Sequence, residues 1–148
     1  MKEDKLIFLV TGAAGFIGSE VVKKLLRNGE DVIGIDNLND YYDPSLKRSR
    51  LSEICKINNE SIGTWIFHQI SIENKKDLDE ILEIYSINVV IHLAASKAAG
   101  ESMLCPEKYS TNNIIGSLNL LNICSKHKIK AFIFSSSAAV YGSPQSKT

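Results

Sequence analysis

Short apolar runs alternate along the chain with longer segments whose apolar residues recur at helical spacing. The runs contain few polar positions, so each predicts a strand buried on both faces. Five such strands are expected, at residues 5–12, 31–36, 64–70, 88–95 and 130–137. Because helical segments separate them, right-handed crossovers would join them into an α/β fold, a doubly wound parallel sheet with helices on both faces.

Four helices are expected between the strands, and turn and capping residues indicate their ends. The signals are a stop at Asn28-Gly29, an N-cap with a first-turn proline at Asp43-Pro44, a cap at Asn74, and a long helix from Pro106 to about His127. The second helix is expected to bury Leu51, Ile54 and Cys55, and in the third Leu78, Ile81, Leu82 and Tyr85 share one face.

The last of these helices is apolar over a wide arc. Ile114, Leu118 and Leu121 form one stripe, and Leu120 with Ile123 widens it. A helix that covers one face of a sheet needs only one stripe. The excess predicts either contact with a partner helix or deep burial within the same domain, and the pattern alone does not choose between them.

Composition narrows the class of protein. Lysine and arginine balance aspartate and glutamate at 17 each, which gives no support to a nucleic-acid or membrane partner. No apolar run is long enough for a signal peptide or a membrane span. Cys55, Cys105 and Cys124 fit no disulfide framework and no metal pattern, so we expect a cytoplasmic protein without a metal site.

The turn after the first strand, "TGAAGFIGSE", carries the strongest chemical signal. Gly12 would permit a tight turn, Gly15 would let the backbone approach a pyrophosphate, and Gly18 would let the following helix pack close to the strand. The helix N-terminus would add unpaired N–H groups and a partial positive charge. A plain strand–helix turn is the alternative interpretation.

Asp36 ends the second strand, near the usual position of the acid that binds an adenosine ribose. Its carboxylate would accept hydrogen bonds from the ribose hydroxyls and repel a 2′-phosphate. Asn37 and Leu38 offer no cation to receive such a phosphate, so the pattern favours NAD over NADP. A turn or capping role for Asp36 is the alternative.

With these residues the chain resembles the extended short-chain dehydrogenase/reductase family, and within it the NAD-dependent sugar-nucleotide epimerases and dehydratases. The stretches that carry the resemblance are "TGAAGFIGS", "DNLND", "VIHLAASKAAGES", "EKYSTNNIIGSLNLL" and "FIFSSSAAVYG". They cover essentially the whole chain. The resemblance implies that residues 1–148 form a Rossmann-type NAD-binding domain, the N-terminal part of an enzyme whose substrate domain lies outside this sequence.

The resemblance also implies roles for individual residues. Ser137 matches the catalytic serine, and the remaining matches are to cofactor-binding positions: Gly12, Gly15, Phe16, Ile17, Gly18, Asp36, Asn37, Ile72, Ala94, Ala95, Lys97, Asn112, Ser135 and Ser136. One position departs from the family, because Ser71 stands where an aspartate is usual. The aspartate's hydrogen bond to the adenine is therefore not implied for this chain.

The implied reaction is 4-epimerization of a UDP-hexose through a 4-keto intermediate, and the implied partner is a second copy of the chain. "KAAGES" is similar to enzymes that interconvert UDP-glucose and UDP-galactose, whereas "DNLNDYYDPSLKRSRL" is also similar to enzymes acting on UDP-glucuronate. The sugar nucleotide is thus left open. Ala138 and Ala139 stand where a 4,6-dehydratase would carry an acid pair, which argues against dehydration.

The family's base is expected to be a tyrosine followed four residues later by a lysine. The residues four positions after the five tyrosines are Ser45, Leu46, Val89, Asn113 and Gln145. We therefore expect the Tyr-x-x-x-Lys pair beyond residue 148. A non-catalytic NAD-binding module is the alternative.

Two other candidates for catalysis are weaker. His92 lies inside a buried strand with no carboxylate partner evident, so a core or pocket-wall role is expected. Without the resemblance, a capping or turn cluster is the alternative interpretation of the serines at 135–137.

Overall fold

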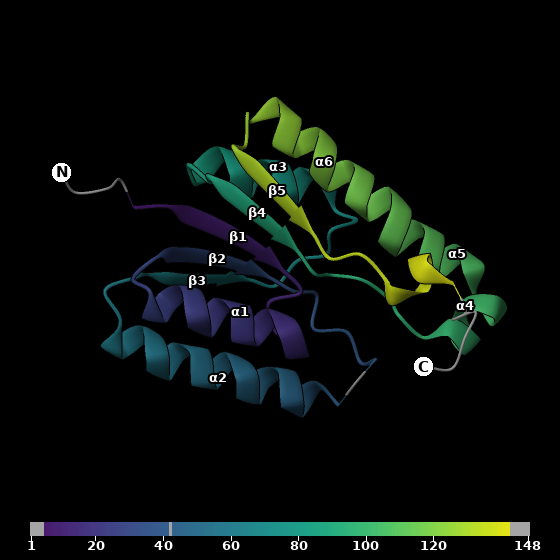
Figure 1. Cartoon of the computed structure of the whole chain (residues 1–148), viewed down its shortest axis with the longest axis horizontal. Coiled ribbons are helices and arrows are strands. Elements are labelled where there is room, and N and C mark those ends of the chain that lie inside the picture. Colours follow the sequence, from purple (N-terminus) through teal and green to yellow (C-terminus); the bar gives the residue numbers. More distant parts are fainter. Residues whose placement is uncertain (1–4, 42, 143–148) are drawn as a thin grey trace.

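One five-stranded sheet forms the centre of the protein. The computed structural model describes residues 5–41 and 43–142. The strands are β1 (Ile7–Thr11), β2 (Asp31–Ile35), β3 (Trp65–His68), β4 (Val89–His92) and β5 (Ala131–Phe134). They are all parallel and lie in the order β3-β2-β1-β4-β5 (Figure 1). The predicted doubly wound fold is therefore confirmed, although each strand ends one to three residues before its predicted end.

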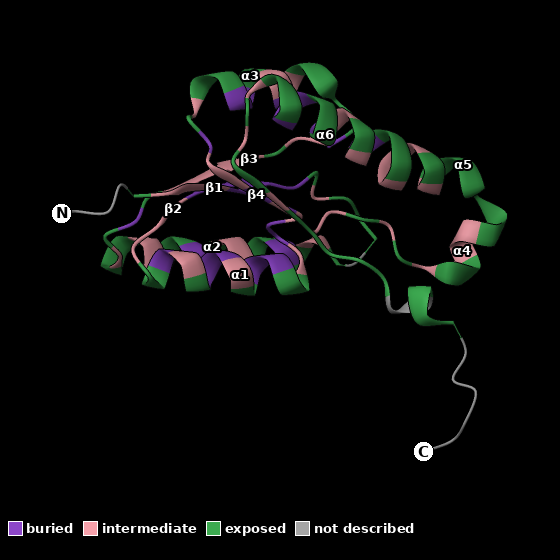
Figure 2. Ribbon diagram, turned by 45° about the horizontal axis from the view of Figure 1, so that its top comes forward, coloured by how far each residue is buried: buried purple, intermediate pink, exposed green. Residues whose placement is uncertain are grey.

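Helices cover both faces of the sheet (Figure 2). Helices α1 (Phe16–Arg27) and α2 (Pro44–Glu60) lie on one face, and α3 (Lys75–Ile84) and α6 (Ser117–Lys126) lie on the other. Alternate residues of each strand point to the two faces, so Val10 joins the core beneath α1 and α2, while Leu9 joins the core beneath α3 and α6. Both side chains are fully buried.

Helix α2 begins as predicted but buries a different set of side chains. The Asp43 carboxylate accepts the Ser45 N–H at 2.8 Å, and Pro44 is the first helical residue. Ile54 is buried, but Cys55 is exposed, so that part of the prediction is wrong. Lys47 is buried instead, because it lies on the same helix face as Ile54, whereas Cys55 is turned about 100° away from Ile54.

The predicted long helix is more elaborate than one regular helix. It comprises α5 (Pro106–Tyr109), a π-helical stretch (Ser110–Gly116) and α6, and His127 follows as the C-cap. A further short helix, α4 (Ala99–Leu104), precedes it and was not predicted. Leu120 and Ile123 face the core, whereas Ile114, Leu118 and Leu121 are 59%, 53% and 44% exposed. We call these three side chains the outer stripe; no part of residues 5–41 or 43–142 buries them.

The strand order reverses at β1, because β2 and β3 lie on one side of it and β4 and β5 lie on the other. Thr11 is in register with both Ile35 of β2 and His92 of β4, so three strands end at one level. Ligand sites of such sheets lie at this reversal point, beyond the carboxyl ends of the strands. Among the described residues, no helix is both long and apolar enough to cross a bilayer.

Candidate functional site

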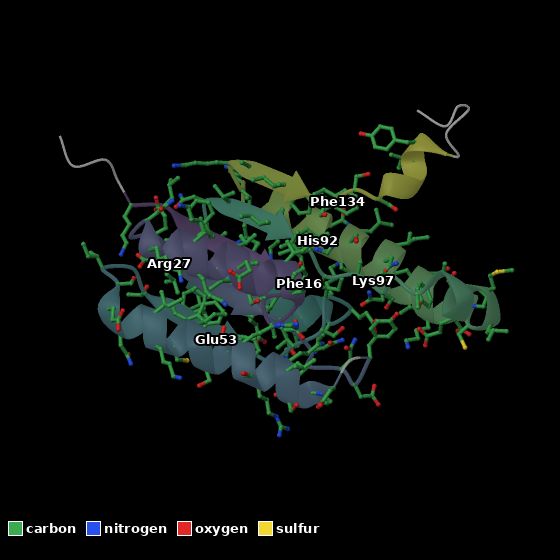
Figure 3. All side chains as sticks on the ribbon, turned by 60° about the horizontal axis from the view of Figure 1, so that its bottom comes forward. Phe16, Arg27, Glu53, His92, Lys97 and Phe134 are labelled. Atoms are coloured by element: carbon green, nitrogen blue, oxygen red, sulfur yellow. The ribbon has the colours of Figure 1, made fainter. Side chains whose placement is uncertain are left out.

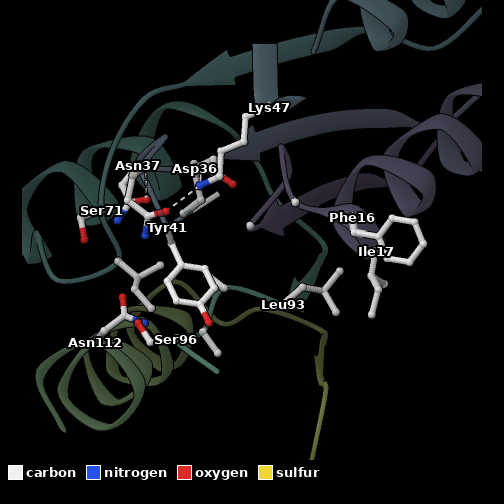
Figure 4. Close-up of a pocket in the computed structure, with 18 of the residues that line it drawn as sticks. Phe16, Ile17, Asp36, Asn37, Tyr41, Lys47, Ser71, Leu93, Ser96 and Asn112 are labelled. Atoms are coloured by element: carbon white, nitrogen blue, oxygen red, sulfur yellow. Dashed lines mark hydrogen bonds and ion pairs between the residues drawn. The ribbon is translucent and has the colours of Figure 1, made fainter. Parts of the chain in front are cut away.

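A pocket of about 510 Å³ opens at the reversal point (Figure 4). Its volume falls within the usual range of small-molecule and cofactor sites. It brings together all the predicted cofactor residues except Ser135 and Ser136: Gly12, Gly15, Phe16, Ile17, Gly18, Asp36, Asn37, Ile72, Ala94, Ala95, Lys97 and Asn112. Asn37 and Ser71 lie at one end of the view in Figure 4, and Phe16 and Ile17 lie at the other.

The glycine loop has the conformation its spacing predicts. Gly12 has a φ of 68°, which side-chain-bearing residues rarely adopt, and it accepts the N–H of Gly15 at 2.9 Å. A Cβ on Gly18 would overlap the carbonyl oxygen of Gly12. Helix α1 can therefore begin against the end of β1 only because residue 18 lacks a side chain.

The N-terminus of α1 opens into this pocket without a competing acid. Gly15 is its N-cap, no side chain caps the first turn, and no acidic residue lies there. The first N–H groups of a helix have no partner within the helix and carry a partial positive charge. Together with the adjoining turn they suit a phosphate or pyrophosphate group.

Asp36 is held rigidly at the end of β2. Its Oδ2 accepts the N–H of Ala14 at 3.2 Å, and its Oδ1 accepts the N–H of Leu38 at 2.8 Å. Only 7% of the residue is exposed. The carboxylate thus joins the glycine loop to the turn that follows β2, and it is fixed where a ligand hydroxyl could reach it.

Two cations that sequence reasoning missed line the pocket together with Asp36. The Lys47 Nζ atom is 3.2 Å from Asp36 Oδ1, and both side chains are buried. Arg50 donates a long hydrogen bond of 3.4 Å to the Ala14 carbonyl and lies over the Phe16 ring. Lys47 and Arg50 are one turn apart on α2, so their spacing places them on one helix face, but it does not reveal that this face meets Asp36.

The opposite wall comes from the loop after β4 and the π-helical stretch. Asn113 exchanges two hydrogen bonds of 2.8 Å with the backbone of Ser96, and it accepts the side-chain amide of Asn112 at 2.8 Å. His92 is buried and hydrogen-bonded, which confirms the predicted core role. Figure 3 shows Phe134 beside His92, with 5.7 Å between the ring centroids.

The three serines after β5 do not line the pocket. The residues from Ser135 to Ser137 are exposed, and the Ser135 N–H donates to the His92 carbonyl at 3.3 Å. A 3₁₀ turn (Ala138–Tyr141) follows them. The roles of these serines therefore remain predictions. The side chains of Ala138 and Ala139, and all of Tyr42, lie outside what the structure describes.

Within residues 5–41 and 43–142, no group of three histidine, cysteine or acidic side chains is placed to hold a metal.

Comparison with known proteins identifies the family that the chain resembles in sequence. The model of the NAD dependent epimerase/dehydratase family matches residues 8–148. The UDP-glucose 4-epimerase of Dictyostelium discoideum is 45% identical over 92% of this chain and 37% of its own length. The UDP-glucuronate 4-epimerase of Thermodesulfobacterium geofontis is 44% identical over 90% of this chain and 40% of its own.

A solved structure agrees with these relatives. The UDP-glucose-4-epimerase of Stenotrophomonas maltophila, determined with bound NAD and formylated UDP-arabinopyranose, superposes with a TM-score of 0.82 at 32% identity. The match covers 95% of this chain and 40% of that one. The chain thus spans about two fifths of the length of the proteins it matches.

Proposed function

The chain belongs to the NAD dependent epimerase/dehydratase family, and from this premise we propose that it is the NAD-binding part of a UDP-sugar 4-epimerase. The reaction would interconvert UDP-glucose and UDP-galactose through a 4-keto intermediate. The observation that carries the proposal is the pairing of an uncapped helix N-terminus with a buried Asp36 in one pocket. These are the two groups that a dinucleotide's phosphates and ribose require.

In this proposal the glycine loop and the start of α1 hold the pyrophosphate, and Asp36 accepts a hydrogen bond from the adenosine ribose. Asn37 and Ile72 contact the adenine, while Ala94, Ala95, Lys97, Asn112, Ser135 and Ser136 lie along the rest of the cofactor. Bound NAD would supply a hydride acceptor and donor. Ser137 would hydrogen-bond the sugar hydroxyl that loses its proton.

UDP-glucuronate is a second candidate substrate. The relative named for that substrate is nearly as similar as the one named for UDP-glucose, at 44% against 45% identity. The gene product purified from its native source, assayed on both sugar nucleotides, separates the two. We expect the larger kcat/KM with UDP-glucose, and a larger value with UDP-glucuronate would replace it as the substrate.

We also propose that the outer stripe of the long helix contacts a second copy of the protein. Its support is the exposure of Ile114, Leu118 and Leu121 on consecutive turns. An apolar stripe of this kind is typical of helix–helix contacts between subunits.

Calorimetric titration of residues 1–148 with NAD tests the proposed function. We expect one NAD to bind per chain. Replacing Asp36 by Asn should weaken binding about tenfold or more, because a charge-assisted hydrogen bond is lost. Asp31→Asn is a matched control, because Asp31 lies at the other end of β2 and pairs with Lys5 outside the pocket. A chain that binds no NAD, or two variants that bind it equally, would contradict the proposal.

A further inference from the structure

Asp36, the proposed ribose-binding residue, forms an ion pair with Lys47 inside the pocket. Lys47 Nζ lies 3.2 Å from Asp36 Oδ1 and donates to Asn39 Oδ1 at 2.8 Å (Figure 4). The Lys47 and Asp36 side chains are only 8% and 6% exposed, yet both residues line the pocket. The ion pair is therefore shielded from bulk water but faces the ligand space.

The hydrogen bonds of this pair leave one acceptor site on Asp36 and one N–H group on Lys47 open. A carboxylate offers about four lone-pair sites. In Asp36, Oδ1 already accepts from Leu38 and Lys47, and Oδ2 accepts from Ala14, so one acceptor site remains, on Oδ2. An ammonium carries three N–H groups. Lys47 directs two of them to Asp36 and Asn39, and the third has no hydrogen-bond partner within residues 5–41 and 43–142.

We propose that Lys47 is a second specificity-determining residue of the dinucleotide pocket, and that the Asp36–Lys47 pair, rather than Asp36 alone, selects the cofactor. In the pair, Asp36 accepts one ribose hydroxyl and Lys47 donates to a ribose oxygen. Without Asp36, the same ammonium is released to bind a 2′-phosphate. This inference rests on the proposed binding of NAD.

The charges around the pair support these separate roles for Asp36 and Lys47. Arg50 also lines the pocket and donates to the carbonyl of Ala14, whose N–H Asp36 accepts, so Lys47 and Arg50 both accompany the carboxylate. Their combined charge does not repel a phosphate. Discrimination against NADP must then come from the Asp36 carboxylate, which pairs with the Lys47 ammonium and fills the space beside it, where a 2′-phosphate would bind. Removal of the carboxylate leaves a polar recess with a lysine, which is the chemistry that recognises a phosphate.

Four proteins test the inference: the unaltered chain, Asp36→Ser, Lys47→Met and the double variant. Each is titrated with NAD and NADP by calorimetry, and its thermal unfolding is recorded. We expect the unaltered chain to prefer NAD and Asp36→Ser to prefer NADP. Adding Lys47→Met to Asp36→Ser should weaken NADP binding about tenfold or more while changing NAD binding much less, because only the phosphate needs the charge.

Two further comparisons separate the role of Lys47 from a loss of stability and from the loss of any positive charge. Lys47→Met alone leaves a buried carboxylate without its cation and can destabilise the fold. The double variant removes both charges, so its NADP affinity can be compared with that of Asp36→Ser without an unpaired buried carboxylate. Lys126→Met removes an exposed lysine paired with Asp79, away from the pocket, and should leave NADP affinity unchanged in the Asp36→Ser background.

Equal NADP affinity in Asp36→Ser and the double variant would overturn the role of Lys47, even if the unaltered chain binds NAD. Failure of the unaltered chain to bind NAD would instead overturn the proposed function, and this inference with it.

Discussion

The Thr11 Oγ1 atom lies 2.7 Å from Nδ1 of His92, and the direction of this buried hydrogen bond is determined. Thr11 Oγ1 also accepts the backbone N–H groups of Leu93 and Ala94, each at 3.0 Å. A hydroxyl oxygen has two lone pairs, which these N–H groups occupy, so its single hydrogen must point to Nδ1. Nδ1 is therefore the acceptor, and the His92 proton resides on Nε2.

The same chain of hydrogen bonds continues to the other wall of the pocket. His92 Nε2 donates to Ser117 Oγ at 2.8 Å, and Ser117 donates to the Asn113 carbonyl at 2.6 Å. The Asn113 side chain holds the backbone of Ser96. His92 thus connects the end of β1 and the loop after β4 to the π-helical stretch, which explains why a polar side chain occupies the core there.

Removing the imidazole should destabilise the fold. In His92→Leu the Thr11 hydroxyl loses its acceptor while it remains buried, which costs about 1–3 kcal/mol. Urea denaturation of residues 1–148 would measure the loss. His68→Leu is the control, because His68 is only partly buried and its ring contacts Tyr85, with a hydrogen bond of 3.3 Å. A loss no larger in His92→Leu than in His68→Leu would contradict the assigned network.

His92 should also make stability depend on pH. Burial lowers the pKa of His92 below its usual value of 6.5. As the pH falls below about 6.5, the unfolded chain takes up a proton that the folded chain refuses, so the free energy of unfolding falls. The contribution is fully present above pH 6.5.

Urea denaturation between about pH 7.5 and about pH 5.5 measures this fall in the free energy of unfolding. The decline should be smaller in His92→Leu, which retains His68 and His127. Asp31 and Asp79, whose pKa values are lowered from 3.8, lose their stabilising effect only at more acid pH. Equal declines in the two proteins would show that His92 is protonated equally in the folded and unfolded chains.

The sequence predicts the part of the site that local spacing determines. Gly12, Gly15 and Gly18 act within one turn, and Asp36 follows its strand directly, so each position could be placed without knowing the tertiary structure. Lys47 could not, because its approach to Asp36 depends on the phase at which α2 packs against the sheet.

The irregular elements had no comparable signal. Helix α4 has six residues, which is too short for a periodic pattern. The π-helical stretch includes Gly116, where a Cβ would lie 2.8 Å from the Ile72 side chain, so a packing contact that no local pattern reveals accompanies it.

Gly18 should not tolerate even one methyl group. In Gly18→Ala the new Cβ would overlap the Gly12 carbonyl oxygen, forcing α1 away from β1. Overpacking of this kind costs about 1–3 kcal/mol, and NAD affinity should fall with it because the helix N-terminus moves. Gly100→Ala is the matched control, since a Cβ there meets nothing within 4 Å and the helix gains a better former. Thermal unfolding and NAD titration of both variants would check this, and an unimpaired Gly18→Ala would refute the close contact.

The outer stripe should make residues 1–148 self-associate. Leu118 and its neighbours on the stripe expose apolar surface, and Ile133 on the edge strand β5 is 53% exposed. Light scattering over a range of concentrations should show a rising mass. Leu118→Gln should lower the association, whereas Ile62→Gln, which changes a side chain that is 88% exposed before β3, should not. A monomer at every concentration would argue against the proposed contact.

Residues 1–148 alone should bind NAD yet fail to epimerize UDP-glucose. Removing the sugar's 4-hydroxyl proton needs a base, and a tyrosine serves as one near neutral pH only when a neighbouring cation lowers its pKa. Tyr109 has the opposite environment: burial and its hydrogen bond to Glu101 raise its pKa to about 12. No tyrosine in the sequence is followed four residues later by a lysine.

Ser137 does not supply the missing base, because an unperturbed hydroxyl holds its proton far more tightly than a catalytic base can at neutral pH. A coupled assay for UDP-galactose should therefore read background for a sample that titrates fully with NAD, and no NADH absorbance should develop with UDP-glucose present. Ser137→Ala should leave NAD binding by this chain unchanged, since the proposed contact of Ser137 is with the sugar hydroxyl and not with the cofactor. Turnover by the purified chain, persisting at constant specific activity through a second chromatographic step, would show that a base other than the Tyr-x-x-x-Lys pair operates in it.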